Sequence, residues 1–136
     1  MYMLDTNILI HAIRNPLSPV TDRIIALAAA GEVCVSAVTC GELVVGVLKS
    51  RNPEKNQKAL EAALAGIPVL SYDSHAARCY AQIRARLEQQ GIPVGDADMM
   101  IGGHAASVSC ILVTNNRKHF DRMGIPVEDW LRDSLN

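Results

Sequence analysis

Short runs of consecutive apolar residues alternate along this chain with longer segments in which apolar residues recur every three or four positions. The first run, Met1–Leu4, ends in Asp5 and is followed by a helical pattern over residues 8–13. Such runs are typical of buried strands in a parallel sheet, and such periodic segments are typical of the helices that cover it. The opening of the chain therefore predicts a central strand with Asp5 at its carboxyl end, and Thr6 or Asn7 as the cap of the next helix.

The alternation continues to the end of the chain. Four later runs predict strands, the last of them a weak edge strand: Val33–Val35, Ile67–Leu70, Cys110–Val113 and Gly124–Val127. Periodic segments with capping residues and glycine stops predict helices over residues 20–30, 37–49, 53–65, 76–90 and 99–107, and a short helical turn near 117–122. Strand-helix units in this order predict one three-layer α/β domain, residues 1–136, with a mainly parallel central sheet flanked by helices.

Composition narrows the class of protein. A chain of 136 residues with 49% hydrophobic content suffices for one domain. It has no signal-like leader and no apolar run of spanning length, so we expect a cytoplasmic protein with no membrane attachment. The four cysteines form no CxxC pair and the histidines no HExxH motif, so zinc is disfavoured, any metal should prefer oxygen ligands, and the cysteines should be core residues. With a net charge of −1, any nucleic-acid contact must use local positive charge.

Three acidic residues, far apart in the sequence, are predicted to face inward or toward a crevice. Asp5 alone is equally well explained as a turn or capping residue. Glu42 is the only charged residue between Val33 and Val47, so it should be paired, hydrogen-bonded, protonated or metal-bound unless its helix face reaches water.

The third acid is found by helical angle. At about 100° per residue, Asp98 lines up with Ile101 and Ala105, which must pack inward. Asp96 is explained by helix capping alone. If Asp5, Glu42 and Asp98 converge, their mutual repulsion calls for a divalent cation, and Mg²⁺ or Mn²⁺ would then assist hydrolysis of a phosphodiester.

Four segments in order resemble the successive signatures of PIN-domain nucleases, above all the VapC toxins of bacterial toxin-antitoxin systems. They are Met3–Asn7, Ser36–Leu43, Gly95–Ala105 and Val113–Asn116, and the likeness extends to the closing Glu128–Trp130. The resemblance implies a Mg²⁺- or Mn²⁺-dependent endoribonuclease, often a homodimer, that a small cognate antitoxin of the VapB type inhibits.

The resemblance also implies roles for individual residues. Asp5 and Asp98 correspond to metal ligands, and Glu42 to the third catalytic acid, which binds the metal directly or through water. Thr6 and Thr114 correspond to supporting residues that orient the acids. Asn116 stands where many family members have a fourth acid, a departure that bears on a second metal ion. Asp121 is an alternative fourth acid, with capping or solvation as the other interpretation.

The substrate implied by the resemblance is RNA, commonly transfer RNA cut at a single-stranded loop, where bases can splay out. The candidates for phosphate contacts, each with a merely solvated role as its alternative, are Arg84, Arg86, Arg117 and Lys118. An aspartate-nucleophile phosphatase is disfavoured, because that chemistry needs an acid at position 7 and Asn7 is found there. The alternative from another class is a catalytically silent PIN-like module that binds RNA or a partner.

Overall fold

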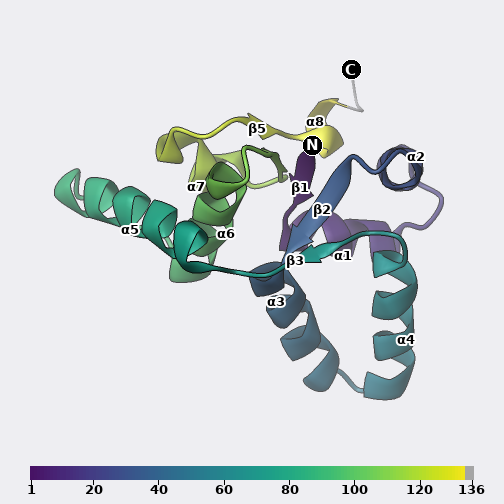
Figure 1. The fold of residues 1–136 in the computed structure, drawn as a ribbon. Helices are drawn as coiled ribbons and strands as arrows, with labels where there is room; N and C mark the ends of the chain where they lie inside the picture. Colours follow the sequence, from purple (N-terminus) through teal and green to yellow (C-terminus); the bar gives the residue numbers. More distant parts are fainter. Residues whose placement is uncertain (134–136) are drawn as a thin grey trace.

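The computed structural model describes residues 1–133, so the last three residues of the predicted domain lie outside the described part. Its centre is a five-stranded sheet in the order β3-β2-β1-β4-β5, in which every strand pair is parallel (Figure 1). The strands are β1 (Tyr2–Leu4), β2 (Val33–Ser36), β3 (Val69–Leu70), β4 (Ile111–Val113) and β5 (Val127–Glu128). The predicted parallel α/β architecture is confirmed.

Eight helices and one 3-10 turn surround the sheet in the described residues. They are α1 (Thr6–Arg14), α2 (Pro19–Ala29), α3 (Ala37–Leu48), α4 (Pro53–Leu64), α5 (Ser74–Gln89), α6 (Asp96–Ser107), α7 (Arg117–Phe120), η1 (Asp121–Met123) and α8 (Trp130–Asp133). The sequence pattern predicted all of the longer helices to within a few residues, and it missed α8. Trp130, the only tryptophan, is buried and packs edge-on against Tyr2, so it anchors the end of the chain as an apolar contact.

Two capping predictions are wrong. The N-cap of α1 is Asp5, whose carboxylate accepts a hydrogen bond from the Ile8 N–H at 3.0 Å, and not Thr6 or Asn7. The N-cap of α6 is Gly95, which makes no side-chain capping bond, so Asp96 is the first residue of the helix and not its cap. In both helices the N-cap lies one residue before the first polar residue that was expected to cap it.

Successive strand residues point to opposite faces of the sheet and build two separate apolar layers. Leu4, Val35 and Val113 pack with α1 to α4 and α8 on one face. Met3 and Leu112 pack with α5, α6 and α7 on the other. The result is the predicted three-layer arrangement, with the α3–α4 hairpin extending beyond the sheet (Figure 1).

The chain changes direction at β1. From this central strand it runs outward through β2 and β3, then crosses back to add β4 and β5 on the other side. In the β1–β4 pair, Leu4 lies opposite Val113, and the Asp5 N–H donates to the Val113 carbonyl at 3.0 Å. Since ligands of parallel sheets bind at the carboxyl ends of strands where the order reverses, the residues that follow Leu4 and Val113 mark the candidate site.

The α5–α6 contact fixes the far layer of the molecule. Gly103 lies so close to α5 that a Cβ atom placed on it would be 2.6 Å from the backbone nitrogen of Tyr80. Only a residue without a side chain permits this approach. Among the described residues, no helix has both the length and the apolar character needed to cross a membrane.

Candidate active site

Asp5 is a buried carboxylate at the carboxyl end of the central strand. Its residue is only 3% exposed, because β4 and the first turn of α1 enclose it. Burial raises its pKa from 3.8 to about 6, and the nearby negative charge of Asp98 acts in the same direction. Hydrogen bonds from the Thr114 side chain and the Ile8 N–H lower the pKa in part. An acid that is this costly to ionise is a candidate functional residue.

Asp98 reaches the same site from the first turn of α6. It is partly buried, and it is close enough to Asp5 for the two carboxylates to interact electrostatically. Its Oδ2 lies 2.7 Å from Nδ1 of His119, which in turn lies 2.8 Å from the side-chain nitrogen of Asn116. The inward direction predicted for Asp98 from helical angle agrees with this placement.

Thr114 and Asn116 follow β4 and line the site beside Asp5. Thr114 is fully buried, its side chain hydrogen-bonds Asp5, and its hydroxyl oxygen accepts the Asn116 N–H at 2.9 Å. The side chain of Asn116 contacts His119 and makes no capping bond to α7. Both residues therefore support the acids, Thr114 by direct contact with Asp5 and Asn116 by way of His119.

Glu42 stands apart from the two aspartates. It lies on α3 and is exposed, so this face of the helix reaches water, which was the alternative to a buried and partnered carboxylate. Its Oε1 nevertheless accepts a short hydrogen bond of 2.6 Å from the Thr6 hydroxyl, one residue after Asp5. Thr6 thus ties the third acid to the carboxyl end of β1.

The site residues provide oxygen ligands for a small hard cation. Asp5 and Asp98 lie close enough to interact electrostatically, and burial together with the negative charge of Asp98 disfavours the ionised form of Asp5. Within residues 1–133, no group of three or more His, Cys, Asp or Glu side chains is arranged to bind a metal ion by itself. This donor set still fits Mg²⁺ or Mn²⁺, because Mg²⁺ commonly takes one or two carboxylates and completes its shell with water and substrate phosphate.

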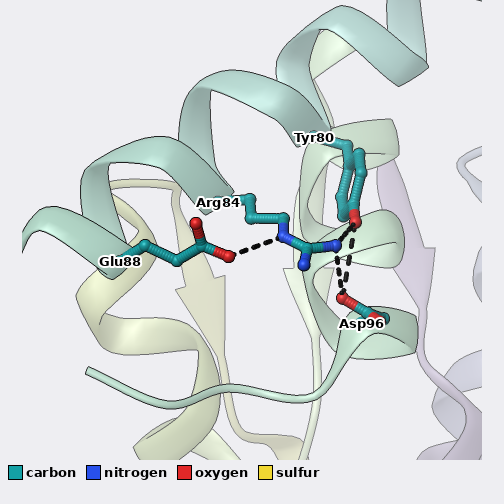
Figure 2. Close-up of polar contacts among 4 residues, drawn as sticks. All are labelled: Tyr80, Arg84, Glu88 and Asp96. Carbon is teal, nitrogen blue, oxygen red and sulfur yellow. Dashed lines mark hydrogen bonds and ion pairs between the residues drawn. The ribbon is translucent and has the colours of Figure 1, made fainter. Parts of the chain in front are cut away.

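Asp96, the other acid of the first turn of α6, is directed away from this site. It pairs with Arg84 of α5 at 3.1 Å, and the Tyr80 hydroxyl lies 3.4 Å from the same carboxylate oxygen. Figure 2 shows Arg84 held between Asp96 and Glu88, with Glu88 at 2.8 Å. Asp96 therefore helps to fasten α6 to α5 and leaves Asp98 as the acid of the site.

The predicted phosphate-binding cations are mostly engaged within the protein. Arg84 is ion-paired as described, Arg86 donates to the carbonyls of Met123 and Arg122, and Arg117 pairs with Asp121 at 3.3 Å. Asp121, the partner of Arg117, is exposed to solvent. Lys118 is exposed and, within the described residues, makes no recorded ion pair or hydrogen bond. Of the four candidates, Lys118 is the one whose charge is not engaged.

The sequence pattern did not indicate His119 as a site residue. The four histidines of the chain are scattered along the sequence. His119 lies 21 positions from Asp98, in a short polar segment with no motif. The one available signal was that this turn directly follows the polar end of β4, next to the segment that carries Thr114 and Asn116.

Comparison with known proteins identifies the class to which this fold and site belong. The PIN domain family model matches residues 2–126, and the chain belongs to the PIN family.

Its relatives within that family are VapC proteins. The chain is 46% identical over 130 residues to the tRNA(fMet)-specific endonuclease VapC of Shigella flexneri, covering 95% of this chain and 97% of that protein. It is 34% identical over 131 residues to the ribonuclease VapC2 of Rickettsia felis, with 96% and 98% covered. A solved structure of DNA-bound VapBC from Salmonella typhimurium superposes with a TM-score of 0.89 at 42% identity, covering 95% of this chain and 97% of that one.

Proposed function

We propose that this protein is a metal-dependent endoribonuclease toxin of a toxin-antitoxin system, and that it cleaves transfer RNA at a single-stranded loop. The observation that carries the proposal is the pair Asp5 and Asp98: a buried acid at the carboxyl end of the central strand and, close to it, an acid from the first turn of α6. Relatives at 46% and 42% identity are named tRNA(fMet)-specific endonucleases, which makes initiator transfer RNA the first substrate to test.

The three acids divide two tasks between them in the proposed reaction. Asp5 and Asp98 would hold the cation, and a hydrogen bond from Thr114 fixes the orientation of Asp5. When bound, Mg²⁺ or Mn²⁺ supplies the positive charge that polarises the scissile phosphate and activates water for attack. Glu42, exposed and oriented by Thr6, accepts a proton from the attacking water. The water oxygen bonds to phosphorus, the phosphorus–oxygen bond to the leaving ribose oxygen breaks, and that oxygen takes a proton from solvent.

The test of this activity uses Asp5→Asn, which keeps the size and the capping oxygen of the side chain but removes its charge. Purified wild-type protein should cut initiator transfer RNA when Mg²⁺ or Mn²⁺ is present and not in EDTA, whereas Asp5→Asn should lose at least about a hundredfold in rate. Sequencing the new RNA ends gives the cleavage position. Unchanged cleavage by Asp5→Asn, or no effect of EDTA, would refute the metal site and favour the alternative of a silent binding module.

We propose that an antitoxin docks on a surface that includes none of the three acids. An apolar groove of about 590 Å³ runs between α1, α2 and α4, and its wall includes Ile25, which is 61% exposed. Several neighbouring solved structures are toxin-antitoxin complexes of VapC with VapB. We expect a small VapB-like antitoxin to lay an apolar segment in this groove, because the exposed apolar surface is otherwise unfavourable in water.

A pair of variants tests this surface. Ile25→Glu should abolish co-purification with an antitoxin expressed from the neighbouring gene, while RNA cleavage by the isolated protein persists. Val108→Glu, at an exposed apolar position after α6 and outside the groove, is the matched control and should leave the complex intact. Equal binding by both variants would contradict the assignment of the groove and leave the nuclease proposal standing.

A further inference from the structure

His119 contacts Asp98, and the roles proposed above for the acids do not involve this contact. Its Nδ1 lies 2.7 Å from Oδ2 of Asp98 and 2.8 Å from the side-chain nitrogen of Asn116. The imidazole, whose side chain is 47% exposed, thus has two partners from different elements, and both contact the same ring nitrogen. An ordinary surface histidine has no such fixed neighbours.

The hydrogen bonding at Nδ1 determines the tautomer. One ring nitrogen cannot donate to a carboxylate and accept from an amide N–H at the same time. With Asp98 ionised, the 2.7 Å contact needs a hydrogen on Nδ1, and the Asn116 amide then turns its oxygen toward the ring, an orientation of the same shape. The neutral ring consequently carries its lone pair on Nε2.

This arrangement divides the two oxygens of Asp98 between two tasks. Oδ2 is engaged by the imidazole, so Oδ1 is the oxygen available to a cation shared with Asp5. Hydrogen bonds of this kind fix the orientation of a ligating carboxylate, and losing one typically weakens metal affinity by about 10- to 100-fold.

We propose that His119 is a positioning residue, whose Nδ1–H holds Oδ2 of Asp98 so that Oδ1 meets the cation beside Asp5. Asn116 acts through His119 by contacting the same ring nitrogen, which limits rotation of the ring. Asn116 thereby serves the site without being a ligand itself. The role of His119 depends on the proposed metal-dependent cleavage.

Two amide substitutions separate the two ring nitrogens. In His119→Asn the amide nitrogen falls near the position of Nδ1 and keeps a donor for Asp98. In His119→Gln the longer side chain places the amide near Nε2 instead, and His119→Ala removes both. His75→Ala, an exposed histidine on α5, is the matched control.

The first readout is binding of Mn²⁺ and of Mg²⁺ to the protein without RNA, measured from the metal-dependent rise of the thermal unfolding midpoint. His119→Ala and His119→Gln should weaken binding by about 10- to 100-fold, while His119→Asn and His75→Ala stay close to wild type. Cleavage by the two weakened variants should recover at saturating metal, because the cation rather than the imidazole does the chemistry.

The second readout needs neither metal nor RNA. Nitrogen-15 NMR of the imidazole in metal-free protein at pH 8 should show the Nδ1–H tautomer of His119. Wild-type metal affinity in His119→Ala, equal losses in all three variants, retention in His119→Gln alone, or an Nε2–H tautomer would each overturn the positioning role. If wild-type protein itself neither binds metal nor cuts RNA, the proposed function fails instead, whatever the tautomer.

Discussion

Replacing Asp5 by Asn should make the metal-free protein more stable while abolishing its activity. The reason is the cost of holding a carboxylate in this site. Burial, with a contribution from Asp98, raises the pKa of Asp5 from 3.8 to about 6. At about 1.4 kcal/mol per pKa unit, the ionised side chain destabilises the fold by about 3 kcal/mol at neutral pH.

The sign of the pH dependence follows from proton binding. Because the folded-state pKa of Asp5 is raised, the folded protein binds more protons than the unfolded chain between pH 3.8 and about 6. The stability linked to this group is fully present below pH 3.8 and is lost as the pH rises through about 6. Wild-type protein and Asp5→Asn should therefore have similar stabilities at pH 3.5 and diverge by up to about 3 kcal/mol at pH 8.

Asparagine is suited to this comparison because it keeps a carbonyl oxygen for the Ile8 N–H, so the cap of α1 is retained. Asp73→Asn is the matched control. Asp73 caps α5 in the same way, accepting the Ala76 N–H at 2.9 Å, but it is solvent-exposed and this hydrogen bond lowers its pKa. Asp73→Asn should give no stabilisation at pH 8.

Urea unfolding in EDTA, followed by circular dichroism from pH 3.5 to pH 8, measures the free energy of unfolding for each protein. Adding Mg²⁺ should stabilise the wild type and not Asp5→Asn, which narrows the difference between them. A difference between wild type and Asp5→Asn that stays constant across this pH range would show that Asp5 is not held in an unfavourable ionised state.

Two further predictions concern the layer formed by α5 and α6. Gly103→Ala should destabilise the protein by about 2 kcal/mol or more, because the new Cβ would lie 2.6 Å from the backbone nitrogen of Tyr80. Gly46→Ala is the control, because no atom lies within 4 Å of its added Cβ. It should leave the thermal unfolding midpoint unchanged or slightly raised. Burial lowers the pKa of His104 below 6.5. The stability linked to this group is therefore present above pH 6.5 and is lost as the pH falls through the folded-state pKa. In urea titrations, His104→Gln should lose less free energy of unfolding than the wild type as the pH falls. An unchanged acid profile in His104→Gln, or equal midpoints for the two glycine variants, would contradict these expectations.

The amino-acid sequence by itself determined the order of the secondary structure and most helix starts. Apolar strands and helical periodicity depend on residues only a few positions apart, and so do the side-chain caps that the structure shows at Ser36, Asn52 and Asp73. The same local information identified Asp98 as the inward acid of its helix, because helical angle fixes direction. The apolar strand ending in an acid likewise indicated Asp5.

Only the tertiary structure decided which side chains meet. The β1–β4 register places Asp5 against Thr114, and the packing of α7 on α6 brings His119 to Asp98. The packing of α5 on α6 also brings Arg84 into an ion pair with Asp96, and the positions of basic residues in the sequence do not reveal this pair. These contacts join residues between 12 and 109 positions apart, and their partners depend on how whole elements pack, which no local pattern encodes.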